Sequence, residues 1–312
     1  MNLFERIVKY AAIAFAVMLS FGILTGILTG VLAAAGMLSE DIPFFRAEHT
    51  EKVDVTKEFS NVKSLKVDVS FGRVEIVEGD TFRVTATQIP KNCVVEMRNQ
   101  TVVVEHEQDA WINVSFLTTE NYADAHILIE VPVGFVADTV QLEHGSGAFS
   151  VEKLATERLE VETGSGSFMA KHLSARTTDL DTHSGNVTIE DSVLGELNLD
   201  TGSGLVHLYR VTAQDVELES GSGSLTIEGT LTGDCSFNTG SGRVDLLLYG
   251  NRDDYRILSE IGSGGLWIEG NRVKEDHIDI SANHTLDFDT GSGRVSLEFE
   301  HHEQEEHHGT SF

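Results

Sequence analysis

The chain has 312 residues and a formal net charge of −28, from 50 acidic and 22 basic side chains. This length permits a large buried core, and the negative charge argues against nucleic acid or an anionic lipid surface as a docking partner. Only two cysteines are present, so no disulfide framework is expected and stability has to come from packing.

A long uncharged stretch near the N-terminus predicts a membrane span. Residues 10–38 contain no charged side chain, and about 20 residues of α-helix suffice to cross a hydrocarbon core of about 30 Å. Arg6 and Lys9 precede the stretch, which places residues 1–9 in the cytoplasm. We therefore expect a single-pass protein of the cell membrane, with everything after residue 38 outside the cytoplasm. A cleavable signal peptide is the alternative, although its apolar region would exceed the usual ~7 to 15 residues.

Small side chains recur every four residues in this stretch, at Gly22, Gly26, Gly30 and Ala34. On a helix they share one face, where a second helix can approach closely, so a transmembrane helix partner or a homodimer is one interpretation. The other is that glycine is simply common in membrane spans. Residues 39–50 follow as a linker.

Residues 51–140 contain several strand-like stretches with irregular spacing, such as 65–69, 74–76, 101–104 and 127–131. They are expected to form the N-terminal irregular rungs and the cap of a repetitive β-structure, because an uncovered first strand would invite edge-to-edge association.

A Gly-Ser-Gly tripeptide recurs through residues 141–299 and is the main signal of the sequence. It begins at Gly145, Gly164, Gly202, Gly221, Gly240, Gly262 and Gly291, and His183-Ser184-Gly185 fills the missing slot. We call each copy of this tripeptide, including His183-Ser184-Gly185, a mark. The first six marks are 19 residues apart, and the last two intervals are 22 and 29 residues. The longer intervals predict longer loops near the C-terminal end, and Ser70-Phe71-Gly72 is an early, degenerate copy of the mark.

The apolar residues keep a fixed phase around these marks. The second and fourth residues after the last glycine are apolar in every copy, and the third residue before the mark is apolar in all copies except at Ser259. Alternation at period two predicts strands with one buried face, and successive units that stack at about 4.8 Å would build one core. The predicted fold is an all-β, single-domain β-solenoid with about 19 residues per rung.

The last glycine of each mark is expected to form a structural corner. The reasons are a positive φ and close stacking of neighbouring corners, which leaves no space for a Cβ atom. His183 replaces the first glycine of one mark, and histidine tolerates the left-handed region, so the first position should be the more permissive. The expected structural corners are Gly147, Gly166, Gly185, Gly204, Gly223, Gly242, Gly264 and Gly293.

An N-terminal span, the opening Ser70 to Asp80, the strand Ile129-Glu130-Val131-Pro132 and serial Gly-Ser-Gly rungs occur together in this chain. In this combination it resembles the bacterial putative-adhesin β-strand-repeat family, and looks most like its LiaG-like membrane-anchored members. The resemblance covers nearly the whole chain. It implies an extracytoplasmic solenoid linked to envelope stress or surface adhesion, and it transfers no functional residue.

An acidic ladder is the strongest candidate site. The residue two before each mark is acidic in seven of eight copies, and stacking would align these side chains on one outward face. Four residues before the marks, Glu160, Asp179, Glu217 and Asp287 would add to a second file. Like charges about 5 Å apart repel by roughly 1 kcal/mol per pair in water, so divalent cations or cationic peptides are expected partners. A solvated face that deters aggregation is the simpler interpretation, which the sequence alone favours. The ladder consists of Glu143, Glu162, Asp181, Asp200, Glu219, Glu260 and Asp289.

No catalytic residue and no cofactor is predicted. The alternative function is a polysaccharide-active β-helix enzyme, whose cleft would need Asp253, Asp254, Arg256, Asp276 and Asp279 from the two longer loops. Cys93 and Cys235 are expected in the core, and residues 300–312 form an acidic, histidine-rich tail that is expected to be disordered. The best interpretation is a non-enzymatic, membrane-anchored binding or scaffold protein of the bacterial cell envelope.

Overall fold

The computed structural model describes residues 51–106, 122–273 and 282–300. Within these ranges the regular structure is β-strand apart from one short 3-10 helix, so the predicted all-β class is confirmed. No helix in the described ranges is long and apolar enough to cross a membrane. The predicted span over residues 10–38, with Gly22, Gly26, Gly30 and Ala34, lies outside the described residues, as do residues 301–312 of the predicted tail.

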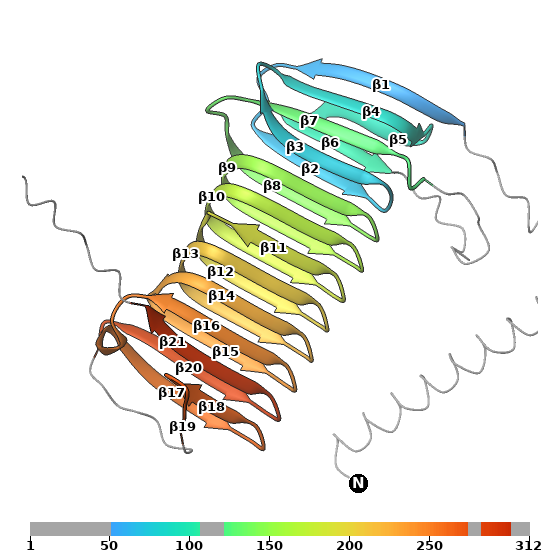
Figure 1. The fold of residues 1–312 in the computed structure, drawn as a ribbon. Helices are drawn as coiled ribbons and strands as arrows, with labels where there is room; N and C mark the ends of the chain where they lie inside the picture. Colours follow the sequence, from blue (N-terminus) through green and yellow to red (C-terminus); the bar gives the residue numbers. More distant parts are fainter. Residues whose placement is uncertain (1–50, 107–121, 274–281, 301–312) are drawn as a thin grey trace, which may run out of the picture. The chain divides into compact units, whose positions relative to one another are not determined.

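The strands stack into rungs above and below one another (Figure 1). The N-terminal end contains β1 (Lys52–Phe59), β2 (Ser64–Val69), β3 (Arg73–Gly79), β4 (Phe82–Pro90), β5 (Cys93–Arg98), β6 (Thr101–His106) and β7 (His126–Pro132). The middle contains β8 (Val136–His144), β9 (Ala148–Thr163), β10 (Ser167–Thr182), β11 (Asn186–Glu190), β12 (Val193–Thr201), β13 (Leu205–Ser220) and β14 (Ser224–Thr232). The C-terminal end contains β15 (Asp234–Thr239), β16 (Arg243–Tyr249), η1 (Arg252–Asp254), β17 (Tyr255–Ile261), β18 (Gly265–Ile268), β19 (Asn271–Val273), β20 (His284–Thr290) and β21 (Arg294–Glu300).

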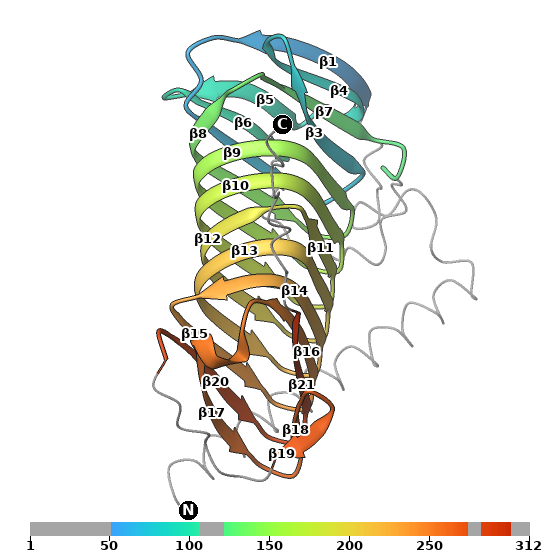
Figure 2. The same ribbon diagram turned by 60° about the vertical axis from the view of Figure 1, so that its left-hand side comes forward.

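Each Gly-Ser-Gly corner separates two parallel sheets, which we call the pre-corner face and the post-corner face. The pre-corner face contains β2, β8, β12, β15, β17, β20 and the C-terminal halves of β9, β10 and β13. The post-corner face contains β3, β11, β14, β16, β18, β21 and the N-terminal halves of β9, β10 and β13. β11, the N-terminal half of β13, β14, β16 and β21 follow one another along one side of the stack (Figure 2).

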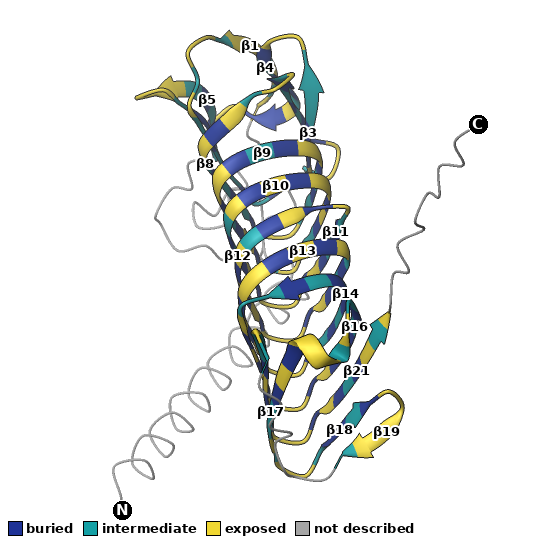
Figure 3. Ribbon diagram, turned by 90° about the vertical axis from the view of Figure 1, so that its left-hand side faces the viewer, coloured by how far each residue is buried: buried dark blue, intermediate teal, exposed yellow. Residues whose placement is uncertain are grey.

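The 19-residue repeat is the register of the parallel pairing. Phe168 pairs with Phe149, and Leu180 pairs with Val161 on one side and Leu199 on the other. These alternate side chains point inward and form one continuous buried cluster, visible as the blue segments of the rungs (Figure 3). Since no single rung can bury its inner face, the core exists only through stacking.

The corner glycines are required for a different reason from the one expected. None of the Gly-Ser-Gly glycines has a positive φ, so the expected left-handed corner was wrong. A Cβ at Gly242 would instead lie 2.4 Å from the carbonyl oxygen of Gly223 in the neighbouring rung. At the first corner position the contact is looser, 2.9 Å for Gly240, so steric space rather than φ makes that position more tolerant.

Positive φ occurs at the other corner of the rungs, where each post-corner strand turns into the return. It is found there in non-glycine residues of four successive rungs, Lys153, His172, Asp191 and Arg210. No glycine pattern marks this corner in the sequence.

A buried side-chain acceptor, which the sequence analysis missed, completes the Gly-Ser-Gly corner. The amides of Gly240, Ser241 and Arg243 donate to carbonyls of the neighbouring rung, whereas the amide of Gly242 donates to Thr239 Oγ1 at 3.1 Å. A buried amide without an acceptor would be costly, which explains a hydroxyl immediately before the corner. The bond to the corner amide is made by Thr239 and His144, whereas the hydroxyls of Thr201, Ser220 and Thr290 have no hydrogen-bond partner among the described residues. Buried polar residues at this position are His144, Thr163, Thr182, Thr201, Ser220, Thr239 and Thr290.

His144 has this role at the first regular corner. Its Nδ1 accepts the amide of Gly147 at 2.9 Å, and its ring contacts Phe149 edge-on at 5.0 Å. Burial lowers the pKa of His144 to about 4, against a smaller opposing effect of the Gly72 carbonyl. The histidine is therefore neutral in the folded protein at physiological pH.

The stacking order departs from chain order at both ends, which corrects the expected strictly sequential stacking. β20 pairs with both β15 and β17, so the last rung of the chain lies inside the stack and the rung of β17 and β18 closes it (Figure 1). β2 likewise lies between β6 and β8. The longer intervals of 22 and 29 residues supply the chain length needed to pass over a layer. The rungs of β2 with β3 and of β20 with β21, which come first and last in the chain, are thereby paired on two sides, which protects them from fraying.

Candidate functional site

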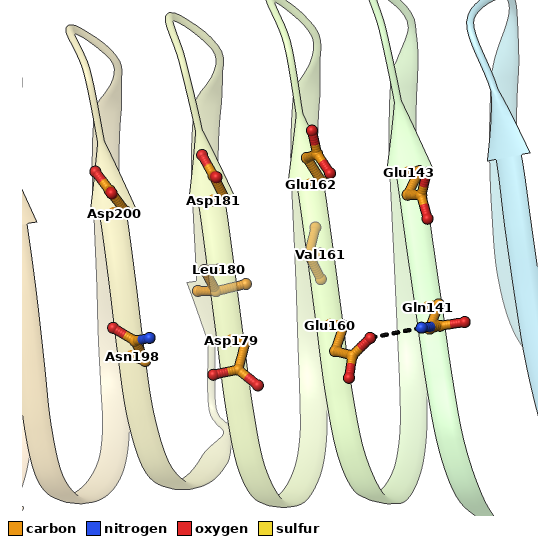
Figure 4. Close-up of a pocket in the computed structure, with 10 residues that line it drawn as sticks. All are labelled: Gln141, Glu143, Glu160, Val161, Glu162, Asp179, Leu180, Asp181, Asn198 and Asp200. Atoms are coloured by element: carbon orange, nitrogen blue, oxygen red, sulfur yellow. Dashed lines mark hydrogen bonds between the residues drawn. The ribbon is translucent and has the colours of Figure 1, made fainter.

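The pre-corner face aligns acidic side chains because its strands are parallel and in register. Val161 and Leu180 point inward, and the residues on either side of them point to solvent (Figure 4). Glu162 pairs with Glu143 on one side and Asp181 on the other, so like charges follow one another at the strand spacing of about 4.8 Å.

Ten stacked positions form this line, which we call the acidic file, and nine of them are acidic. The structure brings all seven predicted ladder residues together and adds Asp68 and Glu105, which the sequence analysis missed. Asp68 could have been found, because it lies two residues before the degenerate mark at Ser70. In stacking order the file contains Glu105, Asp68, Glu143, Glu162, Asp181, Asp200, Glu219, Asn238, Asp289 and Glu260.

The second file, four residues before each mark, has a mixed composition. Gln141 Nε2 donates to Glu160 Oε2 at 2.6 Å, and the guanidinium of Arg158 lies 3.7 Å from Asp179. The remaining positions with a paired register are Val103, Lys66, Asn198, Glu217, Ser236, Asp287 and Leu258. Acidic character is therefore continuous in the first file only.

A shallow groove of about 310 Å³ lies between the two files over four rungs. Its rims are the outward polar side chains, and Val161 and Leu180 contribute to its lining (Figure 4). Such an open, elongated depression suits an extended ligand better than a compact one.

Little positive charge offsets the acidic file. Lys66 lies 3.5 Å from Glu143 and Arg98 lies 2.9 Å from Glu105, whereas Glu162, Asp200 and Glu219 form no ion pair with any described residue. Burial, and next the charge of Glu143, raise the pKa of Asp68 above its usual value. The file thus retains unrelieved repulsion.

Single-sign stacking is not a general property of this solenoid. At the turn from the post-corner strands into the return, charges of opposite sign alternate between rungs. Lys153 lies 2.7 Å from Glu78, Lys171 lies 2.9 Å from Glu190, and Arg210 forms two hydrogen bonds with Asp191 at 2.7 and 2.9 Å. Side chains stacked at the same backbone spacing therefore form ion pairs at this turn, whereas those of the acidic file are nearly all negative.

The described residues contain no group of three or more His, Cys, Asp or Glu side chains that could hold a metal ion. Carboxylates in a straight line do not converge, whereas Ca²⁺ takes about six to eight oxygen ligands around one point. The geometry of the acidic file therefore fits a ligand with several separated positive charges better than a single chelated ion.

The residues of the predicted enzymatic alternative are only partly described. Asp253 and Asp254 are exposed in η1, and Arg256 is exposed in β17. Asp276 and Asp279 lie outside the described residues. Cys93 and Cys235 are buried, and burial raises their pKa values to about 12 and about 11.

Comparison with known proteins gives a family match over most of the chain. The family model described as Toastrack DUF4097 matches residues 62–298. A search of the curated proteins finds no match.

Solved structures of low identity also match. A putative adhesin from Parabacteroides distasonis ATCC 8503 is 10% identical, with a TM-score of 0.45 and coverage of 81% of this chain and 98% of that chain. A putative lipid binding protein from the same organism is 13% identical, with a TM-score of 0.42 and coverage of 80% and 98%. A putative cell adhesion protein from Clostridium sporogenes ATCC 15579 is 14% identical, with a TM-score of 0.32 and coverage of 80% and 100%. These TM-scores are too low to carry a functional argument.

Proposed function

Since the chain belongs to the Toastrack DUF4097 family, we propose that it is a membrane-anchored, extracytoplasmic binding or scaffold protein of the bacterial cell envelope that binds cationic peptide segments along its acidic file. Family membership supports the resemblance to bacterial putative adhesins. We also propose that the protein is a LiaG-like member of this group. Its anchor would be a membrane span over residues 10–38, and its role would be linked to envelope stress or surface adhesion.

One observation carries the choice of ligand. Nine of ten positions stacked at about 4.8 Å are acidic, and beyond Lys66 and Arg98 at the first rungs, Glu162, Asp200 and Glu219 have no ion-pair partner among the described residues. A cationic peptide relieves the repulsion at several rungs simultaneously, and its attraction is strongest where the unbound charges are least paired. The groove beside the file offers room for such an extended chain.

Binding of fluorescent deca-lysine to the full-length protein in a mild detergent tests this proposal. We expect affinity to fall steeply with salt, because the contact is electrostatic. The triple variant Glu162→Gln, Asp181→Asn, Asp200→Asn should bind at least tenfold more weakly.

The matched control removes three carboxylates from the post-corner face, in Glu152→Gln, Glu190→Gln, Glu228→Gln. It should change the affinity less than threefold, because the net charge is the same but the file is intact. Equal loss in both variants would mean that bulk charge alone attracts the peptide, and the proposed site would be wrong.

The proposed orientation has its own test. An epitope added after residue 312 should be accessible to antibody on intact protoplasts. Access only after permeabilisation would contradict an extracytoplasmic domain without bearing on the acidic file.

A further inference from the structure

The post-corner face contains a strip without any charge. In five successive rungs, the first and third residues after the corner point outward, and none of them is Asp, Glu, Lys or Arg. We call this set the uncharged strip: Ala148, Ser150, Ser167, Met169, Asn186, Thr188, Leu205, His207, Ser224 and Thr226.

The contrast with the acidic side is sharp. At the same five corners, the outward positions of the pre-corner face are the residues two and four before each mark. Eight of these ten residues are carboxylates. The two faces have the same backbone spacing and belong to the same rungs. The absence of charge from the strip is therefore a property of the sequence at this place and does not follow from the fold.

The strip has similar boundaries at both ends. In the rung before it, Arg73 lies 3.6 Å from Glu75, and in the rung after it Arg243 lies 2.5 Å from Asp245. Both pairs occupy the same two columns as the strip. Charge therefore returns one rung beyond each end, which gives the strip a length of five rungs, roughly 24 Å.

The strip offers hydroxyl and amide groups together with apolar contact area. Met169 is 54% exposed and Leu205 is 45% exposed, and the polar side chains between them stand in register on neighbouring strands. His207 is stacked on Tyr209 with ring centroids 5.8 Å apart, an interplanar angle of 7° and a 3.3 Å hydrogen bond. Tyr209 borders the strip, so a flat aromatic pair lies at its edge.

The structure argues against several occupants. Every strand of the strip is paired on both sides, so an extended peptide cannot bind by strand addition. The strip covers roughly 240 Å², well below the ~800 Å² per partner of a stable protein interface. A charged ligand would find no partner within the strip.

We propose that the uncharged strip is a binding site for an extended, neutral glycan. A glycan presents rows of hydroxyls that hydrogen-bond to Ser, Thr and Asn side chains, and apolar ring faces that pack on aromatic and Met side chains. Its linear shape fits a site five rungs long and two residues wide. This site is separate from the acidic file and would let one rigid stack hold two different partners.

Isothermal titration calorimetry on the full-length protein tests the site with three neutral hexasaccharides, of glucose, of N-acetylglucosamine and of mannose. A hexamer of galacturonic acid is the charged comparison of equal length. We expect at least one neutral hexamer to bind and the acidic hexamer to bind at least tenfold more weakly.

Variants locate the binding. We expect two variants to bind the neutral hexamer at least tenfold more weakly: the double variant His207→Ala with Tyr209→Ala, and the single variant Thr188→Asp. In both, the melting temperature and the affinity for deca-lysine should stay unchanged. The matched control, Gln141→Ala with Asn198→Ala on the pre-corner face, should leave hexamer binding unchanged. Failure of all three neutral hexamers to bind, equal binding of the acidic hexamer, or unaltered binding by both strip variants would overturn the proposal.

Discussion

Removing one charge from the middle of the acidic file should stabilise the protein. In Glu162→Gln the side chain keeps its size and loses its charge, while the neighbours Glu143 and Asp181 remain. Ordinary surface substitutions are neutral or slightly destabilising, so a gain in stability is a specific expectation of unrelieved repulsion.

The magnitude follows from the strand spacing. Two unit charges about 5 Å apart in water interact by about 0.8 kcal/mol, so two neighbours give at most about 1.6 kcal/mol at low salt. A Debye length of about 8 Å at 0.15 M reduces this by roughly half, and about 3 Å at 1 M leaves a fifth or less. The gain should therefore shrink steadily as salt is added.

Urea unfolding of the full-length protein in 10 mM, 150 mM and 1 M NaCl measures this, because urea leaves the ionic strength unchanged. The matched control is Glu190→Gln, which loses an ion pair of 2.9 Å with Lys171 and should lower stability at low salt. If Glu162→Gln lowers stability in the same way, or if its gain does not depend on salt, the acidic file is not under electrostatic strain.

Three further predictions concern the corner and the core. Gly242→Ala should lower the free energy of unfolding by about 2–3 kcal/mol and Gly240→Ala by about half as much, because the new Cβ meets a carbonyl oxygen at 2.4 Å and 2.9 Å; equal losses in urea unfolding would contradict the steric explanation. Between pH 6.5 and about 4, His144 takes up a proton only when unfolded, so stability should fall by about 1.4 kcal/mol per pH unit as the pH drops, and His144→Thr should remove that part of the slope. A thiol reagent at pH 8 should modify Cys93 and Cys235 only at the rate of unfolding, since burial raises their pKa values to about 12 and about 11; fast labelling of the native protein would show an exposed thiol.

The repeat made much of the architecture predictable. Period-two alternation and a constant 19-residue interval specify which side chains are inward and which lie above one another, so the acidic file could be written down from Glu143 to Glu219. The reason is that parallel in-register stacking converts equal sequence spacing into spatial adjacency. Where the spacing is irregular this conversion fails, which is why Glu105 was missed.

The chemistry of the corner was predicted only in part. Glycine was correctly expected to leave no room for a Cβ, but the assumed positive φ was wrong, because φ depends on how the rung closes and not on residue type alone. The threonine that precedes five of the eight corners was visible in the sequence. Its role as an acceptor for Gly242 became apparent only once the amide was seen to have no partner in the neighbouring rung.

The sequence by itself determined the β class, the inward and outward faces and the acidic composition of one outward column, because these depend on local alternation and equal spacing. Only the tertiary structure decided the layer order at the two ends and the close carbonyl contact at each corner. These depend on which segments far apart in the chain come to lie side by side, and a connecting loop of given length permits more than one choice.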